Sequence, residues 1–135
     1  MEKYGKYGQC AVHAVGIARQ HAETPKTGWS KATGHVFSNG KAARDKGCPK
    51  GAFLGLCEDG IVRGIPRGQY TSSRLNKRYA LDAVEVLIRT PQLSADKDSL
   101  WNAVPDHPLH ENGQMDVVIA LWLNGMIVGS PETDG

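Results

Sequence analysis

The residues best suited to binding a ligand are Cys48-Pro49-Lys50-Gly51, where a lysine and a glycine follow proline at a predicted helix start. The first N–H groups of a helix have no partner within it, and the helix dipole adds positive charge there. Lys50 would add a full charge, and Gly51 would let a phosphate approach the backbone. The segment therefore predicts an anion site. The competing explanation, which the residue types favour, is that Gly51 and Gly55 let another helix pack closely.

Basic residues continue along the following connector. From Gly60 to Leu81 the chain has five cations and no acid. Residues 1–81 carry 14 Lys/Arg and 5 Asp/Glu, whereas residues 82–135 carry 2 and 9. This segregation fits halves that complement each other within one chain or across a homodimer, or a basic face that attracts an anion. On the second interpretation, the predicted ligand-binding residues are Lys50, Gly51, Arg63, Arg67, Arg74 and Lys77.

Cys10 and His13 are candidates for catalysis, with His110 as a further base. The segment Gly8–Ala14 superficially resembles the nucleophile helix of papain-like thiol hydrolases, in which the helix dipole favours the thiolate. Those enzymes usually take their histidine from a sheet, and this sequence predicts none. Cys10 and His13 also lie one turn apart on one helix, so they cannot bracket a substrate alone. We therefore expect Cys10 to be structural.

The sequence predicts no metal site, cofactor or disulfide framework. Its three cysteines form no CxxC pair, and an odd count without an export signal fits reduced thiols. The loop from His107 to Gly113 gathers two histidines and Glu111 but lacks a convincing third ligand. We expect these histidines to lie on the surface.

Apolar periodicity and helix-stop signals predict about six helices. Pro49 is expected at the first position of the third helix, and residues 38–47 are expected to be mainly loop. Asn112 is expected to cap the last helix. The predicted helices are Lys6–Ala22, Thr27–Val36, 48–60, a segment from Ser72 or Ser73 to Arg89, one from Ser94 or Asp96 to Val104, and Gly113–Leu123.

The helix ends repeat. Leu56–Pro66 resembles Leu121–Pro131 at a constant offset of 65, with an Asp/Asn-Gly stop, two apolar residues and Gly-x-Pro in each. A repeated supersecondary unit constrains architecture. The chain is therefore predicted to be one all-α domain, residues 1–135, made of two pseudo-twofold-related three-helix units at about 6–66 and 73–131. The side chains expected in its core are Phe53, Leu56, Val118, Leu121 and Trp122.

Two segments, Gly47–Cys57 and Asn112–Val118, resemble an uncharacterised bacterial family of unknown function. The resemblance covers most of the chain. It implies a recurring compact domain and supplies no activity, cofactor or partner.

These features favour a non-catalytic ligand-binding or interaction module for a nucleotide- or phosphate-like anion or an acidic partner. A hydrolase using Cys10 with a histidine base is one alternative. A nucleic-acid-binding accessory protein is another, although Tyr70 and Tyr79 are too few for a stacking groove. No apolar run is long enough to span a bilayer or to act as an N-terminal export signal, so the cytoplasm is the expected location.

Overall fold

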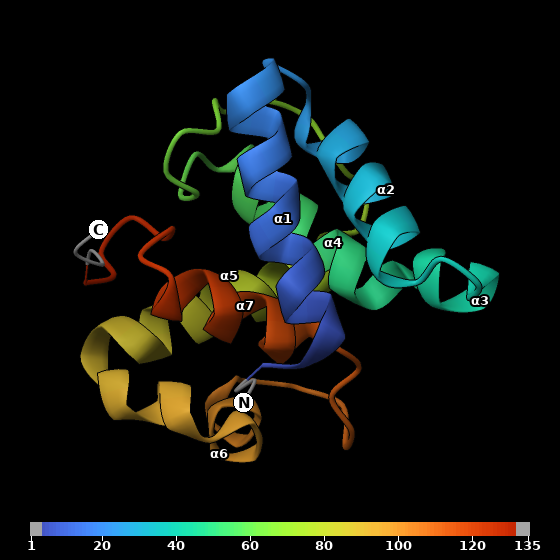
Figure 1. The fold of residues 1–135 in the computed structure, drawn as a ribbon. Helices are drawn as coiled ribbons and strands as arrows, with labels where there is room; N and C mark the ends of the chain where they lie inside the picture. The colour runs from blue at the N-terminus through green and yellow to red at the C-terminus, as the bar shows by residue number, and fades with distance from the viewer. Residues whose placement is uncertain (1–3, 132–135) are drawn as a thin grey trace.

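Helices make up the regular structure of the protein (Figure 1). The computed structural model describes residues 4–131, in which no strand is formed. The predicted all-α class is confirmed, and six helices are longer than the four-residue α3 and the five-residue 3-10 helix η1. The elements are α1 (Gly5–His21), α2 (Pro25–Val36), α3 (Lys41–Arg44), α4 (Gly47–Glu58), α5 (Arg74–Arg89), η1 (Pro91–Ala95), α6 (Lys97–Ala103) and α7 (Gln114–Leu123).

Local signals account for several helix ends. The Thr24 side chain caps α2, and Pro25 occupies an early position at which its missing N–H costs no hydrogen bond. Asp96 caps α6 through two backbone N–H groups. The loop predicted at residues 38–47 also contains the short helix α3.

Three predicted helix starts are wrong. α2 begins at Pro25, two residues before the predicted Thr27. α4 begins two residues before Pro49, which fits there because the first N–H groups of a helix need no partner inside it. The N-cap of α7 is Gly113 rather than Asn112. The Glu111 carboxylate accepts hydrogen bonds from the N–H groups of Gly113 and Met115, each at 2.9 Å. The search for Ser, Thr, Asp or Asn at the cap itself misses an acid placed two residues earlier.

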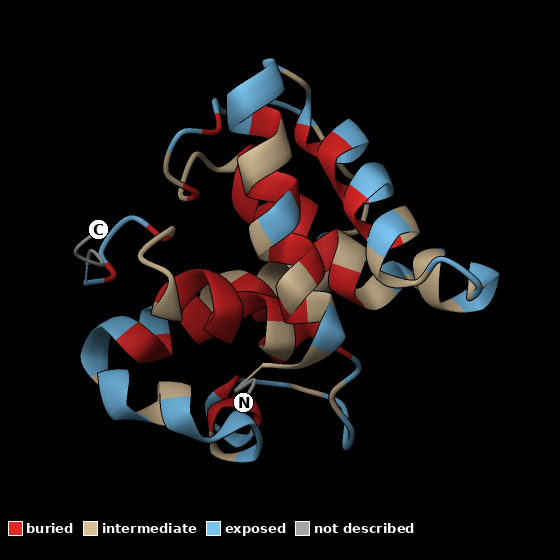
Figure 2. Cartoon of the chain, in the orientation of Figure 1, coloured by how far each residue is buried: buried red, intermediate tan, exposed pale blue. Residues whose placement is uncertain are grey.

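α4 and α7 form the centre of the molecule. They pack against each other, α1 packs on α7, and α5 packs on α4. Figure 2 shows that the buried residues gather where these helices meet. All five predicted core side chains are buried, which confirms that prediction: Phe53, Leu56, Val118, Leu121 and Trp122.

The segments that follow α4 and α7 lie side by side and are joined by an isolated antiparallel bridge. The Arg63 N–H donates to the Met126 carbonyl, and the Val128 N–H donates to the Ile61 carbonyl, each at 2.8 Å. Met126 and Val128 lie 65 positions after Ile61 and Arg63. The two hydrogen bonds are therefore equivalent: in each, the N–H group and the carbonyl come from positions that correspond under the 65-residue offset.

The helix stops in these segments also correspond. Gly60 and Gly125 have φ angles of 73° and 68°, in the left-handed region that glycine adopts without strain. This correspondence is local to the two helix ends. The pseudo-twofold relation between the complete halves stays a prediction.

Candidate anion-binding site

The N-termini of α4 and α5 lie at one open surface hollow of about 370 Å³. Its lining comes from the start of α4, the connector and the start of α5. None of the lining residues is acidic. They are Gly47, Cys48, Lys50, Gly51, Thr71, Ser73 and Asn76.

Neither of these helix starts is capped by a side chain. Lys46 is the N-cap of α4 and Ser73 that of α5, and neither side chain accepts a hydrogen bond from the first turn. The Ser73 hydroxyl instead accepts a hydrogen bond from Asn76 Nδ2 at 2.9 Å. Neither first turn contains an acid. Two sets of N–H groups without intrahelical partners, and the positive ends of two helix dipoles, therefore lie at the same hollow.

Gly51 allows the two helix starts to approach each other. A Cβ atom at this position would lie 2.7 Å from Ser73 Oγ and 2.8 Å from Ser73 Cβ. At Gly55, one turn later, a Cβ atom would lie 2.5 Å from Lys77 Cβ. The structure supports the packing explanation for this glycine pair, and the helix that packs there is α5. Gly51 thus contributes to the hollow by bringing in the start of α5.

Side-chain amides connect the hollow to the start of α7. Gln114 is buried, and its Nε2 donates to Asn76 Oδ1 at 3.1 Å. Its Oε1 accepts a hydrogen bond from the Asn112 N–H at 2.7 Å. The first turn of α5 is therefore held by both α4 and α7.

Lys50 supplies the cationic side chain of the hollow. It is half-buried and makes no ion pair in the described residues. The pKa of Asp45 is lowered mainly by a hydrogen bond from Lys41, with Lys50 as a minor cause. Because Lys41 Nζ lies 2.8 Å from Asp45 Oδ2, it already balances that acid. The Lys50 ammonium group remains available for an anion.

Lys77 lines a second cleft of about 640 Å³, which shares Thr71 with the hollow. Lys77 is paired with acids of the protein itself. Its Nζ lies 2.9 Å from Glu58 Oε2 and 2.8 Å from Asp59 Oδ1. Glu58 is buried, and its Oε1 also accepts hydrogen bonds from the N–H groups of Tyr70 and Thr71, at 2.7 and 2.9 Å. This carboxylate ties α4, the connector and α5 together.

The surroundings of Glu58 favour its charged form. The pKa of Glu58 is lowered to about 2, mainly by the hydrogen bond from Lys77 and then by the one from the Thr71 N–H. Together with the Tyr70 N–H, these hydrogen bonds outweigh desolvation, which raises the pKa. The pKa of Lys77 is raised, mainly by its hydrogen bonds to Asp59 and Glu58. Both groups are charged at neutral pH. The cluster is therefore an internal ion network.

Arg74 belongs to the same network. Its Nη2 donates to the Thr71 carbonyl at 2.9 Å, and its Nη1 lies 3.8 Å from Glu58 Oε2. Its side chain is largely exposed. Arg74 lines the cleft of Lys77 and is absent from the lining of the hollow beside Lys50.

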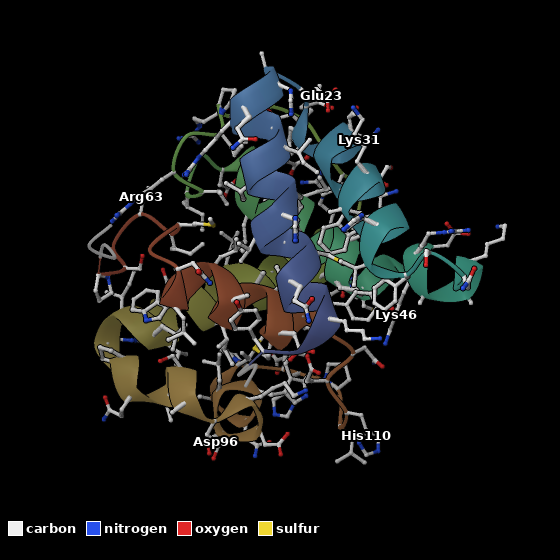
Figure 3. The ribbon with its side chains drawn as sticks, in the orientation of Figure 1. Glu23, Lys31, Lys46, Arg63, Asp96 and His110 are labelled. Atoms are coloured by element: carbon white, nitrogen blue, oxygen red, sulfur yellow. The ribbon has the colours of Figure 1, made fainter. Side chains whose placement is uncertain are left out.

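Arg63 holds the segment after α7. Its guanidinium donates to the carbonyls of Gly125 and Ser130, at 3.3 and 3.0 Å. Figure 3 shows Arg63 across the ribbon from Lys46, the N-cap of α4. Its role in the structure is to join the two helix ends.

Arg67 is exposed, and the stem of its side chain lies over Gly60. Gly60 follows the end of α4, about 18 Å from the start of that helix at 1.5 Å per residue. The six predicted ligand-binding residues therefore fall into two groups. Lys50 and Gly51 line the hollow, whereas the side chains of the other four residues are absent from its lining: Arg63, Arg67, Arg74 and Lys77.

Cys10 lies in the core. Its side chain is fully buried, and burial raises the pKa of the thiol to about 11, so the thiol is neutral at pH 7. His13 and His110 are exposed, and Figure 3 shows His110 on the loop before α7. These positions support the structural role expected for Cys10 and give the hydrolase hypothesis no support.

All three cysteines are free thiols in the structure. In residues 4–131, no group of three or more His, Cys, Asp or Glu side chains is arranged to hold a metal. Glu111 of the histidine-containing loop has a structural role at the start of α7.

The sequence interpretation missed Glu58, Ser73 and Asn76. Glu58 directly follows the buried run Ala52–Cys57, and an acid at the end of such a run needs a partner. That signal was available in the sequence. Ser73 and Asn76 gave none, because they reach the hollow only through the packing of α5 on α4.

The chain forms a small all-helical protein with a polar surface hollow at the starts of α4 and α5. The chain belongs to the family of unknown function DUF6979, whose family model matches residues 4–128. This match confirms the resemblance carried by Gly47–Cys57 and Asn112–Val118. No curated protein and no solved structure matches the chain. Within residues 4–131, no helix has the length and apolar character needed to cross a bilayer.

Proposed function

We propose that the protein is a non-catalytic module that binds a phosphate- or nucleotide-like anion at the hollow between the starts of α4 and α5. One observation carries the proposal: two helix starts without side-chain caps or first-turn acids meet at one hollow beside Lys50. Free N–H groups at a helix start bind anions through hydrogen bonds and the dipole. Here two helices contribute to one site.

The lining favours a phosphate group. Backbone N–H groups, the Lys50 ammonium and the hydroxyls of Thr71 and Ser73 can donate to several oxygens of a tetrahedral anion. A volume of about 370 Å³ lies at the small end of the range for ligand pockets, which suits a phosphate monoester or a mononucleotide. The lining residues include no carboxylate or imidazole to transfer a proton. Binding without catalysis is the function that fits these groups.

Thermal unfolding in the presence of orthophosphate, pyrophosphate and nucleoside mono- and triphosphates tests the proposal. At least one of these anions should raise the melting temperature of the native protein, because a ligand of the folded state stabilises it. Lys50→Ala should weaken its binding about fivefold, since a charge pair at 4 Å in water contributes about 1 kcal/mol. Raised salt should weaken binding further.

Arg67→Ala is the matched control. It removes the same charge from an exposed side chain at the other end of α4. Binding should stay within about twofold of the native protein, because exposed charges that far apart are screened. If no anion stabilises the protein, or if Lys50→Ala leaves every shift unchanged, the proposal is wrong. A larger response to an RNA oligonucleotide than to pyrophosphate would favour the nucleic-acid-binding alternative.

A further inference from the structure

Two histidines lie close together on a different part of the surface. His13 belongs to α1 and His35 to the last turn of α2, and their ring centroids are 6.0 Å apart. Both residues are exposed. Apart from this mutual ring contact, neither imidazole has a hydrogen bond or ion pair in residues 4–131. Their ring nitrogens are free to bind a ligand from solution.

The separation suits two imidazoles that share one metal ion. Metal–nitrogen bonds of about 2.0–2.1 Å at octahedral or tetrahedral angles place the centres of two ligating rings about 4.5 to 5.3 Å apart. The observed separation of 6.0 Å is slightly longer, so the two rings must move toward each other to share an ion. Because both side chains are exposed, a small rotation can bring their nitrogens to one ion.

The two helices hold this pair on a firm scaffold. A Cβ atom at Gly28 of α2 would lie 2.6 Å from the Ala14 carbonyl oxygen of α1, so the two backbones are in close contact. Ala14 is the neighbour of His13 in the chain. Trp29 of α2 is buried in the core. Metal binding would therefore need little rearrangement of the backbone.

We propose that His13 and His35 form a two-histidine site for a late first-row divalent metal ion such as Zn²⁺ or Ni²⁺. Imidazole nitrogen favours these ions, whereas Mg²⁺ and Ca²⁺ favour oxygen. Water or an anion from solution completes the coordination sphere, because both side chains are exposed. The pair has no metal-binding spacing in the sequence because its members come from separate helices. This site is independent of the anion site at α4 and α5.

Nuclear magnetic resonance of the untagged protein tests the site with Ni²⁺ as a paramagnetic probe. A substoichiometric amount should broaden the ring signals of His13 and His35 together and leave those of His21 sharp. His21 is the internal control, because it is exposed and lies in the last turn of α1. Mg²⁺ at the same concentration should change the ring signals of none of these three histidines. Equal broadening of all histidines would overturn the proposal.

Titration calorimetry of the variants gives a second readout. His13→Ala and His35→Ala should each weaken Ni²⁺ binding at least about tenfold, since loss of even an outer-shell partner costs about that much. His21→Ala and Cys48→Ser should bind as the native protein does. Unchanged affinity in His13→Ala, or lost affinity in Cys48→Ser, would show that the ion binds elsewhere. The broadening experiment needs no variant, so it stands even if one of these proteins fails to fold.

Discussion

Replacing Glu58 by glutamine should lower the free energy of unfolding at pH 7 by about 3 kcal/mol. The change removes the charge of a buried carboxylate and leaves Lys77 beside it in the same surroundings. Removing one partner of a buried ion pair costs about 3–5 kcal/mol, because the remaining charge keeps its desolvation penalty. Asp59 still contacts Lys77, which places the expected loss at the lower end. Denaturant unfolding of both proteins at pH 7 measures it.

The same variant should change the pH dependence of stability. Glu58 has a folded-state pKa of about 2, below its ordinary value of 4.5. Its contribution is therefore complete above about pH 4.5 and is lost as the pH falls through about 2. The native protein should lose this stability on acidification. The free energy of unfolding of Glu58→Gln should depend less on pH between about 4.5 and 2.

Asp45→Asn is the control for this prediction. Asp45 pairs with Lys41 on the surface, where both side chains are mostly exposed. An exposed pair of this kind is screened by solvent and contributes little to stability. If Glu58→Gln cost no more than Asp45→Asn at pH 7, the Glu58 network would not be a main link between α4, the connector and α5.

Replacing Leu121 by alanine should cost about 2–5 kcal/mol, because the large-to-small change leaves a cavity at a fully buried position of α7. Leu109→Ala is the matched control, since that leucine is 83% exposed. It should change stability by less than about 0.5 kcal/mol. Denaturant midpoints of the two variants make the comparison. A loss below about 1 kcal/mol for Leu121→Ala would contradict the central position of α7.

The helices and the core could be predicted because their signals are local. The apolar run of α7 indicates burial without knowledge of any partner, and Gly60 and Gly125 mark helix ends through their own backbone preference. The close approach of a helix to Gly51 and Gly55 was also one of two explanations open at the sequence level. The identity of that helix, α5, depends on how the chain folds back.

Only part of the candidate site could be predicted, because the rest depends on how distant segments of the chain pack together. Lys50 follows a helix start, as the sequence predicts, and the structure places it in the lining of the hollow. The basic stretch of sequence predicts the same role for Lys77, but the fold brings Lys77 against Glu58 and Asp59. A count of charges along the sequence cannot show which cations are already paired.

The most direct test of the anion site is a titration of the isotope-labelled protein with pyrophosphate, followed through its backbone amide resonances. We expect saturable shifts in the first turns of both helices, at Gly47, Cys48 and Lys50 of α4 and at Arg74, Leu75 and Asn76 of α5. Lys50→Ala should need more pyrophosphate to reach the same shifts. If these six amides stay in place, or if the shifts gather around Arg67 instead, two meeting helix starts do not form the binding site.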